Sequence, residues 1–371
     1  MSYWFYFYCL LVLVACGSNT KSKTSVEQKT KAQIFNDEVK YVNSLDFITP
    51  HKGSSYNIGE ELIVEFDCKK RFLLDSSDVF VDGNKMAHLG PGEKRAVLTL
   101  PKNRVGSSSV KVIGYHPQKQ QCIITVAIKL KPDKAPVKCT FDIINTFKHD
   151  KDAYTQGLVY REGYMYESTG QYGESGIRKI DMSNQNILSL LSIDNQYFGE
   201  GITIWKDKIY QLTWHACKGF VYDIKSFSLE SSFSYSSEGW GLTTCNDKLI
   251  MSDGSHILYH ISPEGFNILK SVEVYDNQGP VKQLNELEYV DGLVWANVWL
   301  SDRIIAIDPN TGIVKYEIDG SSLLTKAERS ALSDSDDVLN GIAWNPESKT
   351  FYLTGKRWPK LFEVRIKGLP K

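Results

Sequence analysis

Along the C-terminal two-thirds of the chain, hydrophobic and polar positions recur in a fixed order. Each repeat opens with one polar or aromatic residue, usually followed by glycine and then by leucine or isoleucine. The five opening residues, which are 44, 40, 45 and 55 positions apart, are Gln156, Glu200, Trp240, Asn285 and Asn340. A polar turn and two apolar strands follow each of them, and four repeats continue into an outer strand. This pattern predicts a five-bladed β-propeller over residues 139–371.

The last repeat ends without an outer strand. Residues 141–147 (FDIINTF), which precede the first repeat, have the composition of a strand. We expect them to supply the missing strand and to close the ring by pairing its two ends. Closure of this kind leaves fewer exposed strand edges.

The repeat also predicts where a site would lie. The innermost strand of each blade runs along the central channel, so its first residue lies at one mouth of the channel. The second strand returns to the same mouth, where its last residues are Thr169, Trp214, Gly254, Trp299 and Lys356. Ten positions should therefore converge there, and a carboxylate, an ammonium and three indoles among them are typical of a pocket. Packing between blades for each tryptophan, and a solvated ion pair for Glu200 and Lys356, are the alternatives.

Residues 44–132 have a different pattern, with short strands separated by turns. Polar and β-branched residues alternate over 61–66, 78–83, 95–100, 108–115 and 122–130. Seven or so strands in a segment of this length predict an immunoglobulin-like β-sandwich, so the chain as a whole is expected to be all-β. Residues 131–136, with two prolines, would link the sandwich to the propeller. Nothing in this part indicates chemistry, and we expect a spacer or a docking module.

The N-terminus predicts an envelope protein. Residues 3–15 form an apolar run that is too short to span a bilayer comfortably and suits a signal peptide. The run ends at Leu-Val-Ala-Cys16, which resembles a bacterial lipobox, where the cysteine is lipidated. Residues 1–16 would then be a lipoprotein signal peptide and residues 17–43 a flexible tether to the membrane, with the protein facing the periplasm or the exterior. An ordinary signal peptide with a chance cysteine is the alternative.

Charge and cysteine content limit the partners, disulfides and metal sites that the chain is expected to have. The 43 basic and 44 acidic residues nearly balance, so nucleic acid is not expected as a partner. Apart from Cys9 and Cys16, five cysteines remain, an odd number that argues against a full disulfide framework, and none has metal-ligand spacing. Cys68 and Cys122 lie in two predicted strands of the sandwich. They either pair across it or stay as free thiols.

Ten ordered motifs carry a family resemblance over essentially all of residues 139–371. They are TQGL (155–158), ESTGQYG (167–173), FGEGIT (198–203), QLTW (211–214), EGWGLTT (238–244), SDGS (252–255), LNELEYV (284–290), ANVW (296–299), LNGIAW (339–344) and TGKRWP (354–359). They resemble the propeller-type glutaminyl cyclases of plants and bacteria, and the sandwich has no part in the likeness. The resemblance implies a glutaminyl-peptide cyclotransferase, an acyltransferase that converts an N-terminal glutamine of a peptide or protein into pyroglutamate and releases ammonia. It also implies that catalysis needs no zinc or other cofactor.

The same resemblance assigns roles to individual residues. Glu200, in FGEG, would be the catalytic acid and base. Lys356, Asn285 and Gln156 would form the polar pocket. As a mechanistic hypothesis, Lys356 and Asn285 would polarise the substrate carbonyl, and Gln156 would hold the substrate amide or amine. The aromatic wall would consist of Trp214, Trp240 and Trp299. Tyr154 stands where the family often has phenylalanine, which keeps the ring and adds a hydroxyl group.

Two other functions stay open at this point. Oxygen atoms of Glu200, Asn285 and Asn340 could bind a hard cation at the channel mouth, as in a metal-dependent propeller hydrolase or lactonase. A structural cation in the channel is compatible with cyclisation as well. A non-catalytic surface-binding propeller is the other alternative, since a fold does not determine a function.

Overall fold

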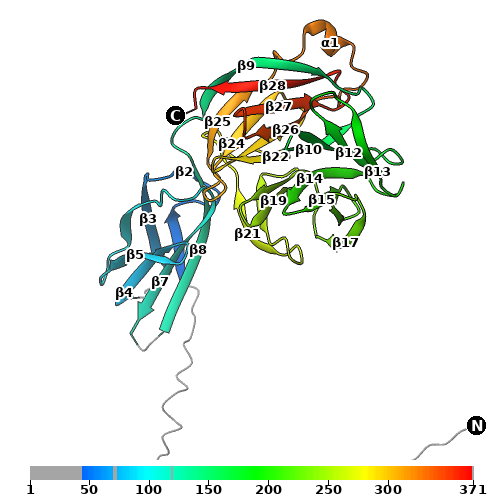
Figure 1. Cartoon of the computed structure of the whole chain (residues 1–371). Coiled ribbons are helices and arrows are strands. Elements are labelled where there is room, and N and C mark those ends of the chain that lie inside the picture. The colour runs from blue at the N-terminus through cyan, green and yellow to red at the C-terminus, as the bar shows by residue number, and fades with distance from the viewer. Residues whose placement is uncertain (1–43, 70–72, 118–119, 370–371) are drawn as a thin grey trace, which may run out of the picture. The chain divides into compact units, whose positions relative to one another are not determined.

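The structure is a computed structural model that describes residues 44–69, 73–117 and 120–369 (Figure 1). Within these residues the regular structure is β-strand apart from one short helix, α1 (Lys326–Ser330). The predicted all-β class is confirmed. No helix in this part of the chain is long and apolar enough for a membrane crossing. The predicted signal peptide, Cys16 and the tether fall in residues 1–43, outside the described range.

The N-terminal part consists of two sheets. One has the strand order β1-β3-β6, and the other has the order β2-β8-β7-β4-β5. The strands are β1 (Leu45–Thr49), β2 (Ser55–Asn57), β3 (Glu61–Cys68), β4 (Ser76–Val81), β5 (Asn84–Leu89), β6 (Arg95–Thr99), β7 (Gly106–His116) and β8 (Gln120–Lys131). Five of them coincide with the predicted strands. Neighbouring strands are antiparallel except for β2 and β8, which are parallel.

Alternation along these strands builds a common core. In β3, Leu62, Val64 and Phe66 are buried, and the residues between them are more exposed, because successive side chains of a strand point to opposite faces. They belong to one hydrophobic cluster with Val110 and Val112 of β7. The two sheets therefore share one core.

Both cysteines of this part are free thiols, so the disulfide alternative is not realised. Cys122 is fully buried, and its thiol donates to the carbonyl of Gly114 at 3.6 Å. Cys68 is half-buried. Burial raises the pKa of both thiols, which disfavours the reactive thiolate.

The C-terminal part contains three antiparallel sheets of four strands, β10 to β13, β14 to β17 and β18 to β21, and one sheet of eight strands. The strands of the first two sheets are β10 (Thr155–Arg161), β11 (Tyr164–Thr169), β12 (Gly176–Asp181), β13 (Ile187–Ser192), β14 (Gly199–Trp205), β15 (Lys208–Thr213), β16 (Lys218–Asp223) and β17 (Leu229–Ser234). The third sheet has β18 (Leu242–Cys245), β19 (Lys248–Ser252), β20 (Ile257–Ile261) and β21 (Ile268–Glu273). In each sheet, the four strands follow one another in chain order.

The eight-stranded sheet joins the two ends of the repeat region. Its strands are β22 (Leu284–Val290), β23 (Leu293–Val298), β24 (Arg303–Ile307), β25 (Val314–Asp319), β26 (Leu339–Asn345), β27 (Thr350–Gly355), β28 (Lys360–Lys367) and β9 (Val137–Lys148). As predicted, β9 supplies the outer strand of the last repeat by pairing antiparallel with β28. Its first residues also pair in parallel with β25, which the sequence pattern did not predict.

The five innermost strands form a closed ring, because β10, β14, β18, β22 and β26 each contact the next and β26 contacts β10. Their backbones approach closely, which explains the glycine of the repeat. A Cβ atom on Gly201 would lie 2.6 Å from the carbonyl oxygen of Trp240, and one on Gly241 would lie 2.0 Å from that of Asn285. Neither position has room for a side chain.

The fourth repeat has Glu286 in place of this glycine. Its carboxyl group accepts hydrogen bonds from the backbone N–H groups of Leu158 (3.2 Å) and Ile342 (2.8 Å), so it ties β22 to β10 and to β26. Burial and the nearby Glu288 raise the pKa of Glu286 well above its ordinary value. Glu286, the residue that departs from the repeat, thus links β22 by hydrogen bonds to two other strands of the ring.

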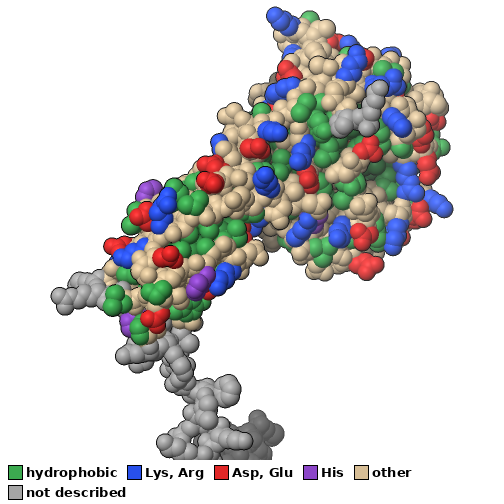
Figure 2. All heavy atoms as spheres, turned by 90° about the vertical axis from the view of Figure 1, so that its left-hand side faces the viewer, with side chains coloured by type: hydrophobic (Ala, Val, Ile, Leu, Met, Phe, Trp, Pro, Cys, Tyr) green, Lys and Arg blue, Asp and Glu red, His purple; other side chains and the backbone are tan. Residues whose placement is uncertain are grey.

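Surface charge is mixed. On the face of the molecule in Figure 2, acidic and basic side chains lie interspersed. This arrangement fits the near balance of the two signs in the sequence.

Candidate active site

A cavity of about 440 Å³ lies where the innermost strands begin. It is lined by Tyr154, Gln156, Gln171, Tyr172, Phe198, Glu200, Trp214, Trp240, Asn285, Trp299, Asp334, Asp336, Lys356 and Arg357. All eight residues that the sequence singled out for catalysis or substrate binding are among them. The structure therefore brings together side chains from all five repeats.

Three of the ten positions expected at the mouth do not line the cavity. Asn340 is fully buried, and its amide nitrogen donates to the side-chain oxygen of Gln156 at 3.2 Å. Gly254 lies against the ring of Trp240, where an added Cβ would come within 2.6 Å of it. Thr169 is buried at the end of β11. The repeat places the backbones correctly, but it does not fix which side chains reach the cavity.

Glu200 lies at the start of β14 with only 4% of its surface exposed. Its Oε1 accepts a hydrogen bond from Nε2 of Gln156 at 3.0 Å. Asn340 in turn holds the other end of the Gln156 amide, so that amide has a fixed orientation. Gln156 is thus engaged on both sides, and its main contact is the carboxyl group of Glu200.

The surroundings of Glu200 set its protonation. Burial raises the pKa of this carboxyl well above its ordinary value, and the positive charge of Lys356 opposes this rise only in part. A carboxyl group with a raised pKa can give up a proton and take one back near neutral pH. Perturbed groups of this kind gather at functional sites.

Lys356 follows β27 and is 3% exposed. Its Nζ lies 3.3 Å from the hydroxyl of Tyr154 and 3.4 Å from Oδ2 of Asp336, and 5.8 Å from the centre of the Trp299 ring. Burial lowers the pKa of Lys356, whereas Asp336 and Glu200 work in the opposite direction. The ammonium group therefore lies beside the carboxyl group of Asp336 on the wall of the cavity, and it also interacts electrostatically with Glu200.

Aromatic rings form the remaining walls. Trp214 and Trp240 both donate their indole N–H to Oε2 of Glu238, at 2.8 and 2.9 Å. Trp240 meets Trp299 edge to face, with ring centres 5.3 Å apart. Phe198 packs against Trp214 with ring centres 5.5 Å apart. Rings held in this way present a rigid apolar surface to a ligand.

Sequence reasoning missed the acidic groups of the site. Asp336 accepts hydrogen bonds from the hydroxyl of Tyr154 and from the indole of Trp299 (2.6 Å), and it faces Lys356. It lies in the segment 320–338, which makes the last repeat interval longer than the others. The 55-residue spacing was the available signal, but a repeat alignment assigns no position to inserted residues. The ten repeat positions include one carboxylate, Glu200, and the cavity lining adds Asp334 and Asp336 to it.

Asn285 is buried at the start of β22, and its side-chain oxygen has no hydrogen-bond partner among the described residues. The side-chain oxygen of Asn340 is in the same state. A buried polar atom without a partner is costly, so each calls for a bound group or a water molecule. The described part of the chain has no group of three or more His, Cys, Asp or Glu residues suited to a metal.

Comparison with known proteins gives consistent results. The family model described as glutamine cyclotransferase matches residues 118–366. A glutaminyl-peptide cyclotransferase of Arabidopsis thaliana is 40% identical over 231 residues, which cover 61% of this chain and 71% of the relative. The crystal structure of Myxococcus xanthus glutaminyl cyclase matches with a TM-score of 0.59 and 37% identity, and the match covers 63% of this chain and all of that one.

Proposed function

This chain belongs to the glutamine cyclotransferase family and is a glutaminyl-peptide cyclotransferase, and we propose that Glu200 is its proton carrier. The substrate is a peptide or protein with an N-terminal glutamine. The observation that carries the proposal is the buried carboxyl group of Glu200, held by Gln156 on the wall of the same cavity as Lys356.

The reaction needs a proton to move from one nitrogen to another. The α-amine attacks the side-chain amide carbon, a new C–N bond forms, the old C–N bond breaks and ammonia leaves. Glu200 in its protonated form gives its proton to the departing nitrogen and takes one from the attacking nitrogen, so the carboxyl group ends as it began. General acid and base catalysis of this kind contributes about 10²–10⁴-fold in rate.

The other polar groups act on charge and orientation. Lys356 and the amide of Asn285 stabilise the negative charge that develops on the carbonyl oxygen, as preorganised donors do in a water-poor site. Gln156 was expected to bind substrate. Because both ends of its amide are engaged within the protein, we propose instead that it orients Glu200.

The aromatic wall supplies positioning. Trp214, Trp240, Trp299 and the ring of Tyr154 would hold the flexible glutamine side chain near its cyclic shape and exclude water. Ring closure already has its nucleophile in the same molecule, so correct placement can supply much of the remaining rate enhancement.

The activity test is mass spectrometry of a Gln-initiated peptide incubated with the enzyme, and the expected result is loss of one ammonia. Chelator treatment separates the proposal from the metal-dependent hydrolase. We expect full activity after a chelator has removed divalent cations, because the proposed chemistry uses only protein groups. Total loss with rescue by a cation would instead favour the hydrolase, and binding of the peptide without turnover would favour a surface-binding module.

A structural cation in the channel is compatible with this proposal. The side-chain oxygens of Asn285 and Asn340, which have no hydrogen-bond partner in the described part of the chain, are hard ligands of the type that Ca²⁺ prefers. If such an ion is present, the chelator should lower the melting temperature while the activity at moderate temperature persists.

Asp336 provides a test of the charge on Lys356. In Asp336→Asn the negative charge that favours the ammonium form is lost, so the pKa of Lys356 should fall further below its usual value. On the alkaline side of the pH profile, kcat/KM should then begin to decline at a lower pH than in the wild type. A profile of kcat/KM against pH measures this shift. If deprotonation of Glu200 causes this decline instead, the decline should begin at a higher pH, because a weaker positive charge at Lys356 raises the pKa of Glu200. Asp291→Asn, at an exposed aspartate in the turn between β22 and β23, is the matched control and should leave the profile unchanged.

We also propose that the C-terminal sheets are the five blades of a β-propeller and that the N-terminal sheets form an immunoglobulin-like sandwich, in domains 139–371 and 44–132. The closed contact of the five innermost strands supports the blades, and the shared core of two facing sheets supports the sandwich. An experimental structure in which β26 and β10 are not neighbours would overturn the first assignment.

For location, we propose that Cys16 carries lipid and anchors the enzyme in a bacterial cell envelope, with residues 17–43 as the tether. The support is the lipobox-like sequence at the end of the apolar run. Cys16→Ser should move the protein from the membrane fraction to the soluble fraction. Nucleic acid is not a proposed partner.

A further inference from the structure

His149 lies outside the catalytic cavity, directly after β9, and its side chain is 5% exposed. Its Nδ1 is 2.7 Å from the carbonyl oxygen of Trp358. Its Nε2 is 2.9 Å from Oε1 of Glu167, on β11. The imidazole thus lies between the first repeat and the turn that follows β27.

These contacts indicate that the ring is an imidazolium. A backbone carbonyl and an ionised carboxylate can only accept hydrogen bonds, whereas a neutral imidazole has a single N–H group. Both short contacts are favourable together only when both ring nitrogens carry a proton. The geometry therefore calls for a buried positive charge at His149.

The groups around His149 support this charge. Glu167 accepts hydrogen bonds from the hydroxyl of Thr155 at 2.6 Å and pairs with Nε of Arg178 at 3.2 Å. Arg178, on β12, also pairs with Asp150 at 2.7 Å, and Lys148 lines the same small cavity. Burial raises the pKa of Glu167, but the neighbouring His149 and Arg178 outweigh it and bring the pKa to about 2. Burial likewise works against the charge on His149, and Glu167 overcomes it and raises the pKa of this histidine.

Trp358 connects this pair to the catalytic cavity. Its side chain is fully buried against Gly355, where a Cβ would come within 2.5 Å of the indole ring. Its indole N–H donates to the carbonyl of Asp337 at 2.9 Å, next to Asp336. Lys356 is two residues before Trp358, and its backbone N–H donates to the carbonyl of Val338 at 2.9 Å. The turn that carries Lys356 and the loop that carries Asp336 are thus fastened to each other through Trp358.

We propose that His149, an imidazolium paired with Glu167, is a positioning residue whose Nδ1–H, bonded to the carbonyl of Trp358, holds Lys356 and Asp336 in their catalytic arrangement. The proposal rests on the proposed function of Lys356. His149 itself does not line the cavity, so it acts on the reaction only through the turn.

Two substitutions separate the two contacts. The amide nitrogen of asparagine can reach the place of Nδ1, so His149→Asn keeps a donor for Trp358 and removes the one for Glu167. The longer glutamine places its amide nitrogen near Nε2, so His149→Gln keeps the contact with Glu167 and leaves the carbonyl of Trp358 without a donor. Both variants remove the same charge, and each is therefore the control for the other.

Steady-state kinetics with a Gln-initiated peptide, well below both melting temperatures, is the measurement. We expect His149→Gln to lose roughly tenfold in kcat with little change in KM, and His149→Asn to stay within about threefold of the wild type. Equal kcat values in the two variants, whatever their melting temperatures, would overturn the proposal, because a purely structural role predicts no such split.

Nitrogen NMR of labelled His149 tests the charge without any assay of activity. Two protonated ring nitrogens at neutral pH support the bridge, and a single protonated nitrogen overturns it. If the wild type releases no ammonia from the peptide, the proposed function fails, and the NMR result still decides whether His149 forms this bridge.

Discussion

Replacing Glu200 with glutamine is expected to lower kcat for a Gln-initiated peptide by roughly 10²–10⁴-fold. Glutamine has the same shape, and its oxygen can still accept the hydrogen bond from Gln156. It cannot give a proton to the departing nitrogen or take one from the attacking amine. The measurement is ammonia release in steady state, with the melting temperature recorded to show that the fold is intact.

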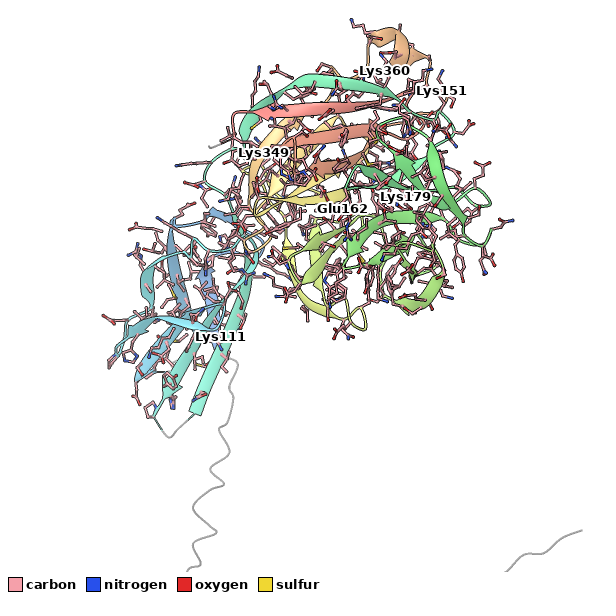
Figure 3. The ribbon with its side chains drawn as sticks, viewed as in Figure 1. Lys111, Lys151, Glu162, Lys179, Lys349 and Lys360 are labelled. Carbon is pink, nitrogen blue, oxygen red and sulfur yellow. The ribbon has the colours of Figure 1, made fainter. Side chains whose placement is uncertain are left out.

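Glu162→Gln is the matched control for this variant. Glu162 is an exposed residue in the turn between β10 and β11, and it is labelled in Figure 3. Glu162→Gln makes the same chemical change as Glu200→Gln, but at the opposite end of β10 from Gln156. It should therefore leave kcat unchanged. Near-normal turnover by Glu200→Gln would remove Glu200 from the mechanism and would direct attention to Asp336, the other carboxyl group that faces Lys356.

Replacing Lys356 with methionine is expected to lower kcat by roughly 10²–10³-fold, the usual loss for one donor to a developing oxyanion. Methionine keeps most of the length of the side chain, so the aromatic wall should stay in place. The effect should be smaller than that of Glu200→Gln, because Asn285 would still donate to the same oxygen. KM should change much less than kcat if the interaction forms mainly in the transition state.

Lys360→Met is the comparison for this variant. Lys360 begins β28, near α1 in Figure 3, and pairs with Glu328 away from the cavity. We expect a change of less than twofold there, since a partly exposed ion pair outside the cavity contributes little. A tenfold increase in KM with unchanged kcat in Lys356→Met would show that Lys356 only binds the ground state.

The sequence pattern predicted the arrangement of the C-terminal strands well, because each repeat carries the same local signals. The opening residue, the glycine and the following apolar strand recur at nearly constant intervals, so residues as distant as Gln156 and Lys356 could be placed at one mouth. Even the exception at Glu286 fits, since a carboxyl group there takes hydrogen bonds from the backbones on either side.

The sequence pattern could not predict the direction of individual side chains or the place of inserted segments. Asn340 occupies the expected ring position, yet its side chain donates a hydrogen bond to Gln156 and does not line the cavity. Asp336 comes from a segment that no other repeat has. In the N-terminal part, β2 escaped specific prediction because it has only three residues, and β5 (NKMAHL) because it is poor in β-branched residues. β1 was missed although it is as long as β6.

The pairing of β9 with β28 has a consequence for how the enzyme is synthesised. Tyr154 and Lys356 meet across 202 residues of sequence, and Asn145 of β9 and Glu363 of β28 meet across 218. A ribosome releases the N-terminal end first, so β9 must wait for nearly the whole chain before its partner exists. Contacts between such distant residues also form slowly. A nascent chain that ends before Lys356 therefore has no complete site, and we expect activity to appear only near the end of synthesis.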